Sequence, residues 1–127
     1  MERFHISIYS DFAEFWRYNI AVMSFVSHDG EQVELLKCRD DVAPVGSSLT
    51  SPPMGYNPNR KIELHHAPAD NLTLYIYILP HTFPWSVDIE ETPPFELRVE
   101  VKYGDTLRYA HSFEVEQWSG GDIVVEL

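Results

Sequence analysis

The stretch of sequence that decides the fold runs from Phe95 to Tyr103 and reads FELRVEVKY. Apolar side chains occupy every second position, and charged side chains occupy the positions between them: Glu96, Arg98, Glu100 and Lys102. Successive side chains of a β-strand point to opposite faces, so this alternation predicts a strand with one face in a core and the other in water. Such half-solvated strands are typical of antiparallel sheets.

Similar runs recur along the chain, separated by clusters of Gly, Pro, Asp, Asn and Ser. We expect strands at 4–9, 20–27, 32–37, 61–66, 71–79, 85–91, 95–103, 107–118 and 123–127. Turn signals every eight to twelve residues are typical of sandwiches and small barrels. The sequence therefore predicts an all-β fold, an antiparallel two-sheet β-sandwich of about eight strands that forms a single domain over residues 1–127.

Turn residues and side-chain patterns add detail to this expectation. The residues HDGE at 28–31 indicate a hairpin, and the turns at 104–106 and 119–122 predict a C-terminal three-stranded meander. Residues 71–79 are apolar on both sides, which predicts a central strand or one covered by another element. At most one short helix is expected, near Asp11–Arg17, where an acidic N-cap precedes an amphipathic turn.

A long segment at 38–60 is rich in Pro, Gly and Ser and lacks periodicity. Because proline removes a ladder donor, a central strand is not expected within it. We interpret the segment as a disordered or crossover loop that joins the two sheets. The alternative is a partner-binding tip formed by Met54 and Tyr56.

Charge and cysteine content exclude several classes of protein. The chain has 127 residues and a net charge of −11, so it offers no basic surface for nucleic acid or for anionic membranes. The single cysteine, Cys38, excludes an intramolecular disulfide. No apolar run is long enough for membrane insertion or resembles a signal peptide, so we expect a cytoplasmic protein unless a targeting segment has been removed.

The sequence gives no positive sign of catalysis. Six histidines are scattered without ligand spacing, the acidic residues match no calcium loop, and nucleophile and nucleotide motifs are absent. Lys37 and Arg39 flank Cys38 and could lower the pKa of its thiol, but no hydrolase signature accompanies them. We predict no catalytic residue, no metal ligand and no cofactor, and we favour a protein without enzymatic activity.

Aromatic residues in loops are the remaining candidates for contact with a ligand or partner. They are Tyr56, Phe83, Trp85 and Trp118. Such residues can anchor a protein partner or stack on sugar rings, and they can also plug the ends of a sandwich. The sequence therefore favours a module for protein–protein association, either with a different protein or by self-association. The alternative function is binding of a carbohydrate or another small ligand through these loop aromatics.

Overall fold

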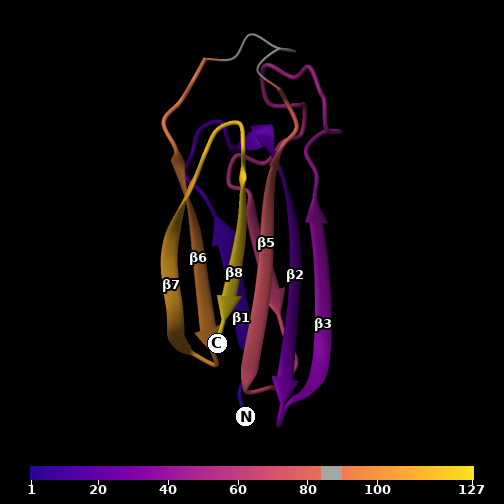
Figure 1. Cartoon of the computed structure of the whole chain (residues 1–127), viewed down its shortest axis with the longest axis vertical. Helices are drawn as coiled ribbons and strands as arrows, with labels where there is room; N and C mark the ends of the chain where they lie inside the picture. The colour runs from indigo at the N-terminus through magenta and orange to yellow at the C-terminus, as the bar shows by residue number, and fades with distance from the viewer. Residues whose placement is uncertain (84–89) are drawn as a thin grey trace.

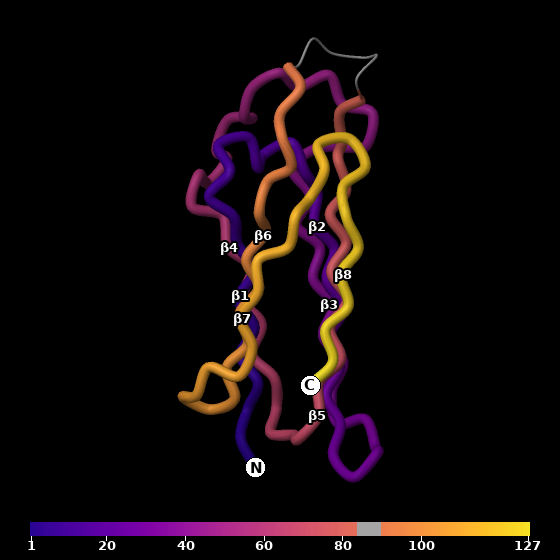
Figure 2. The backbone as a smooth tube through the Cα atoms, turned by 60° about the vertical axis from the view of Figure 1, so that its left-hand side comes forward, coloured from indigo at the N-terminus to yellow at the C-terminus, as the bar shows by residue number. Residues whose placement is uncertain are grey.

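The computed structural model describes residues 1–83 and 90–127, and these residues form eight strands. The strands are β1 Phe4–Tyr9, β2 Tyr18–His28, β3 Glu31–Asp40, β4 Lys61–His65, β5 Asn71–Pro80, β6 Phe95–Tyr103, β7 Thr106–Val115 and β8 Gly121–Glu126. All pairings are antiparallel, and they give two sheets with the orders β4-β1-β6-β7 and β3-β2-β5-β8. The second order can be followed in Figure 1. The sheets lie as two layers in Figure 2, which confirms the predicted two-sheet sandwich.

The core lies between the two sheets and is built by the predicted alternation. In β6, the side chains of Leu97, Val99 and Val101 are fully buried, whereas the charged side chains between them point outward. In β5, the alternate residues Leu74 and Ile76 face the same core from the opposite sheet. Burial of these aliphatic faces provides most of the driving force for packing the layers together.

The predicted hairpin at 28–31 is confirmed. Strands β2 and β3 are joined by Asp29 and Gly30, whose φ angles are 50° and 80°. Positive φ at both central residues is the requirement of a type I′ turn, whose twist matches that of the flanking strands. An Asp-Gly pair adopts this geometry at low cost.

The predicted C-terminal meander is wrong. Strands β6 and β7 form a hairpin, but β8 pairs with β5 in the other sheet. The crossing is made at the turn before β8, where Tyr18 donates a hydrogen bond from its hydroxyl to the Gln117 carbonyl at 2.8 Å. A turn signal shows where the chain reverses, but it does not show which sheet the next strand joins.

The short helix is smaller than the sequence predicts. Only a 3₁₀ turn forms, at Phe15–Arg17, and the Asp11 cap is not used. All three residues of the turn are buried, because this segment carries the chain from β1 in one sheet to β2 in the other. A bend that buries consecutive side chains cannot keep an amphipathic helical face.

The long connection begins later than predicted. Strand β3 continues through Asp40, so residues 38–40 belong to the sheet and the loop begins at 41. Residues 41–60 then cross from β3 to β4 in the other sheet, as expected for a crossover. The Asn19 side chain holds the start of this loop by accepting a bond from the Val42 N–H and donating one to the Ala43 carbonyl, both at 2.7 Å.

The strand expected at 85–91 falls mostly outside the described residues, and Glu90 and Glu91 are not part of a strand. Among the described residues, no helix is long and apolar enough to cross a membrane.

Candidate functional site: an uncovered apolar sheet face

Two of the four loop aromatics predicted as contact residues, Tyr56 and Trp118, lie in different places. Tyr56 lines a pocket of about 440 Å³ beside the crossover loop, and Trp118 lines a different pocket of about 520 Å³. Trp118 is half-buried, with the guanidinium carbon of Arg17 at 4.7 Å from its ring centroid. Phe83 is also half-buried, and Trp85 lies outside the described residues. Tyr56 and Trp118 therefore do not form a shared platform for a sugar or partner.

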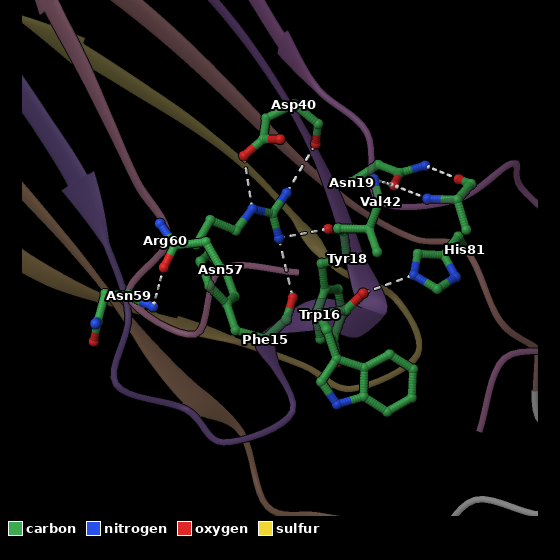
Figure 3. A network of polar contacts seen from close by, with 11 residues as sticks. Phe15, Trp16, Tyr18, Asn19, Asp40, Val42, Asn57, Asn59, Arg60 and His81 are labelled. Carbon is green, nitrogen blue, oxygen red and sulfur yellow. Dashed lines mark hydrogen bonds and ion pairs between the residues drawn. The ribbon is translucent and has the colours of Figure 1, made fainter. Parts of the chain in front are cut away.

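The pocket beside Tyr56 is also lined by Arg60 and Asp40, whose polar contacts are shown in Figure 3. The Arg60 guanidinium donates from Nε to the Asp40 carboxylate at 2.7 Å and from Nη1 to the Phe15 and Tyr18 carbonyls at 3.1 and 2.8 Å. Nη2 donates to the Asp40 carbonyl at 2.8 Å. Because these bonds occupy most of its donors, Arg60 ties the loop to the sandwich and is not free to bind a ligand.

His81 fixes the other part of the crossover loop. One of its ring nitrogens, Nε2, lies 2.8 Å from the Trp16 carbonyl (Figure 3). The other, Nδ1, lies 2.6 Å from the Ser47 hydroxyl. The Gly46 and Ser47 N–H groups both donate to the His81 carbonyl at 2.8 Å. His81 is fully buried, and this burial lowers the pKa of its ring. These contacts are structural, because they join the loop to the 3₁₀ turn before β2 and to the residue that follows β5.

A chain of hydrogen bonds resembling a catalytic triad lies between the sheets. Ser24 Oγ is 2.7 Å from His66 Nε2, and His66 Nδ1 is 2.8 Å from a Glu34 carboxylate oxygen. The order Ser–His–carboxylate is that of hydrolases. However, Ser24 and His66 are 0 % and 1 % exposed, so a substrate has no access to the hydroxyl in this structure. Glu34 also accepts a hydrogen bond from the Ala67 N–H at 2.9 Å. These hydrogen bonds therefore hold the start of the β4–β5 connection against β3.

Lys37 and Arg39, which could have lowered the pKa of the Cys38 thiol, do not contribute to its shift. Burial, and secondarily the nearby Asp40 carboxylate, raise the pKa of the Cys38 thiol. Cys38 packs against the core, whereas Lys37 and Arg39 are exposed on the outer face of β3. Neighbours on a strand point to opposite faces, so adjacency in sequence does not bring these cations to the sulfur.

The most distinctive surface is the outer face of the sheet β3-β2-β5-β8. We call it the apolar face, and it consists of Ala21, Met23, Phe25, Leu35, Tyr75, Tyr77, Leu79 and Val124. Four of these side chains are exposed, and Val124 is the most exposed at 58 %. No described segment of the chain lies over this face along the strands (Figure 2).

The strand register places these side chains in rows across the sheet. One row contains Lys37, Met23, Tyr75 and Val124. The next rows contain Leu35, Phe25, Thr73 and Glu126 on one side, and Arg39, Ala21, Tyr77 and Asp122 on the other. The centre of each row is uncharged, and the charges lie on the edge strands β3 and β8. A shallow groove of about 440 Å³ runs between Met23, Lys37 and Tyr77.

The other sheet presents a different outer face. Its outward side chains in β1, β4 and β6 are mostly polar or charged, and they include His5, Ser7, Glu63, Arg98 and Glu100. Part of the contrast is visible in the sequence, because residues 71–79 are apolar on both sides. The structure confirms that β5 is a central strand and shows that its outer side is not covered by any described element. Sequence reasoning did not select Tyr75, Tyr77 or Val124.

Two groups of described residues place three potential metal ligands within 4.8 Å of one another: His5, Glu63 and His65, and His28, Asp29 and Asp70.

No protein-family model, curated protein or solved structure matches this chain.

Proposed function

We propose that this protein is an association module whose apolar face binds the same face of a second copy. The observation that supports the proposal is the group of apolar and aromatic side chains on β2 and β5, around Met23, Tyr75 and Tyr77, that no described segment of the chain covers. Contiguous apolar patches of several hundred Å² on a folded protein mark interaction sites. Tyrosine and methionine are enriched in the cores of such sites.

The size of the face suits a modest dimer interface. Strands lie about 4.8 Å apart and rise about 3.3 Å per residue, so four strands of this length present roughly 500–600 Å² of sheet. Two such faces in contact would bury about 1,000–1,200 Å², which is near the lower limit for a specific interface. We therefore expect a reversible dimer that dissociates on dilution.

The charges at the edges favour a second copy as the partner. Lys37 and Arg39 lie on edge strand β3, and Asp122 and Glu126 lie on edge strand β8. A two-fold axis parallel to the strands brings β3 of one copy over β8 of the other. Because Arg39 and Asp122 share a row, the rotation places opposite charges together at both ends of that row.

The first test places a charge at the centre of the face. Tyr77→Glu should raise the dimer dissociation constant at least about tenfold, because a carboxylate would be desolvated in an apolar interface. The matched control is Ala110→Glu, an exposed position on the edge strand β7 of the other sheet, which should leave the constant unchanged. Sedimentation velocity over a range of concentrations measures both constants.

The second test examines the orientation of the copies. Arg39→Glu and Asp122→Arg should each weaken the dimer, and the double variant should restore it, because both row ends regain opposite charges. The exposed 3.1 Å ion pair between Arg39 and Asp41 competes with the contact between Arg39 and Asp122, so we expect each single variant to raise the dissociation constant only a few-fold.

A wild-type chain that stays monomeric at millimolar concentration contradicts the proposal. Equal weakening by Ala110→Glu and Tyr77→Glu would also contradict it.

A further inference from the structure

Two histidines that are far apart in sequence lie side by side on the polar outer face of the other sheet. His5 in β1 is directly opposite His65 in β4, and their ring centroids are 4.0 Å apart with an interplanar angle of 25°. The His66 N–H donates to the Phe4 carbonyl at 3.0 Å, so a backbone bond flanks the pair. His5 and His65 are therefore a non-hydrogen-bonded pair, the kind in which side chains lie closest across antiparallel strands.

Glu63 completes the group. It lies two residues before His65 and therefore on the same face of β4. One ligand atom from each of His5, Glu63 and His65 lies within 4.8 Å of the other two. The Nε2 atom of His5 is shielded from solvent and has no hydrogen-bond partner among the described residues. A buried ring nitrogen without a partner is costly, and a bound ligand would remove that cost.

We propose that His5, Glu63 and His65 form a binding site for a divalent transition-metal ion of the zinc type. Two imidazoles and one carboxylate are a ligand set that Zn²⁺ accepts, with bonds of about 2.0–2.2 Å and at least one position left for water. Imidazole ligands also favour Cu²⁺ and Ni²⁺ over Mg²⁺ and Ca²⁺, which prefer oxygen. Because β4 is a short edge strand, the ion would fasten it to β1.

The surroundings of the group set the strength expected of the site. Lys102 lies opposite His5 on the other side of β1, and the Lys61 ammonium is 3.3 Å from Glu63 Oε1. These two cations oppose a metal ion, so we expect moderate affinity. The Lys61 contact uses one carboxylate oxygen of Glu63 and leaves the second oxygen for coordination.

The second group of potential ligands has a different geometry. In His28, Nδ1 lies 2.7 Å from Asp70, and Nε2 lies 3.3 Å from Asp29. Both ring nitrogens thus face carboxylates on opposite sides, an arrangement suited to a protonated ring that donates two bonds. A single ion cannot bind both nitrogens of one ring, so an ion bound by this group would break at least one of the two contacts. His28 therefore serves as the matched control.

The test is calorimetric titration of untagged protein with Zn²⁺. We expect one ion per chain. His65→Asn and Glu63→Gln should each weaken binding at least about tenfold, a loss that even second-shell changes can reach. His28→Asn should leave it unchanged. Both altered ligand positions are exposed, so the variants should fold, and circular dichroism checks this. Zn²⁺ should also raise the melting temperature of the wild type but not that of His65→Asn.

A spectroscopic readout identifies the ligands directly. The Cu²⁺ complex should show electron paramagnetic resonance splitting from two equatorial imidazole nitrogens, and His5→Asn should reduce this to one. The proposal is overturned if the wild type shows no stoichiometric heat with Zn²⁺. It is equally overturned if His28→Asn abolishes binding while His65→Asn retains it.

Discussion

At the scale of single residues, two buried histidines show how the protein uses polar groups in its interior. His66 bonds both Ser24 and Glu34, and His81 bonds both Ser47 and the Trp16 carbonyl. A neutral His66 ring satisfies both contacts when its Nδ1–H donates to the carboxylate and its Nε2 accepts a hydrogen bond from the Ser24 hydroxyl. Both rings therefore act as neutral links between strands and loops.

The first prediction is that stability falls as the pH decreases below about 6.5. Burial lowers the pKa of His66 and of His81 from the model-compound value of 6.5, although Glu34 partly opposes this for His66. Below that value the unfolded chain binds protons that the native chain does not, so the free energy of unfolding decreases until the native pKa is reached. The pKa of His28 is raised, chiefly by Asp70, so its contribution to the pH dependence of stability has the opposite sign. The His28 ring lies on the surface, whereas His66 and His81 are buried.

Urea unfolding at about pH 7.5 and about pH 5.5 measures this dependence. His66→Gln should be less stable than the wild type at both values but should show a smaller difference between them. The control, His111→Gln, changes an exposed ring on β7 and should keep the wild-type difference. An unchanged pH dependence in His66→Gln would contradict the prediction.

At the scale of elements, the turn before β8 decides how the chain distributes its strands between sheets. Gly120 has a φ of 66°, and its N–H bonds the Glu116 carbonyl at 3.0 Å. A Cβ atom at this position would clash with the Ile78 carbonyl oxygen of β5. The turn therefore needs glycine for its backbone conformation and also for the close approach of two backbones.

The second prediction separates these two requirements. Gly120→Ala should lower the free energy of unfolding by about 2–4 kcal/mol, the sum of the positive-φ cost and a steric clash with backbone. Gly55→Ala is the control, because Gly55 has a φ of 86° but nothing within 4 Å of an added Cβ. Gly55→Ala should lower the free energy of unfolding by only about 1 kcal/mol. Urea unfolding measures the loss in both variants. Equal losses in the two variants would show that the contact with β5 is unimportant.

At the scale of the whole molecule, the net charge of −11 acts on any association between copies. Two such chains repel each other at long range, whereas the proposed contacts between Arg39 and Asp122 involve only the ends of one row. Salt shortens the Debye length from about 30 Å at 0.01 M to about 8 Å at 0.15 M, which screens the repulsion far more than it affects apolar contacts.

The third prediction is that dimerisation strengthens as salt is raised over this range. Sedimentation velocity at the two ionic strengths measures the dissociation constant, which should decrease. The Tyr77→Glu variant should remain largely monomeric in both conditions. A dimer that weakens with added salt would show that ion pairs at the edges, and not the apolar face, dominate the association.

The sequence by itself predicted all eight described strands and the two-layer architecture, because side-chain alternation is a local property that reports directly on burial. The repeating pattern in residues 95–103 and the Asp29–Gly30 turn could be interpreted without knowing any partner strand. The same holds for the apolar character of both sides of residues 71–79.

Only the tertiary structure decided which strands are neighbours, and with them the candidate sites. The assignment of β8 to the sheet of β5, the rows of the apolar face and the pairing of His5 with His65 all depend on register between distant segments. A one-residue shift in register would move every side chain of a strand relative to its partners. Nothing within a single strand specifies that alignment, because it is set by the packing of the two layers as a whole.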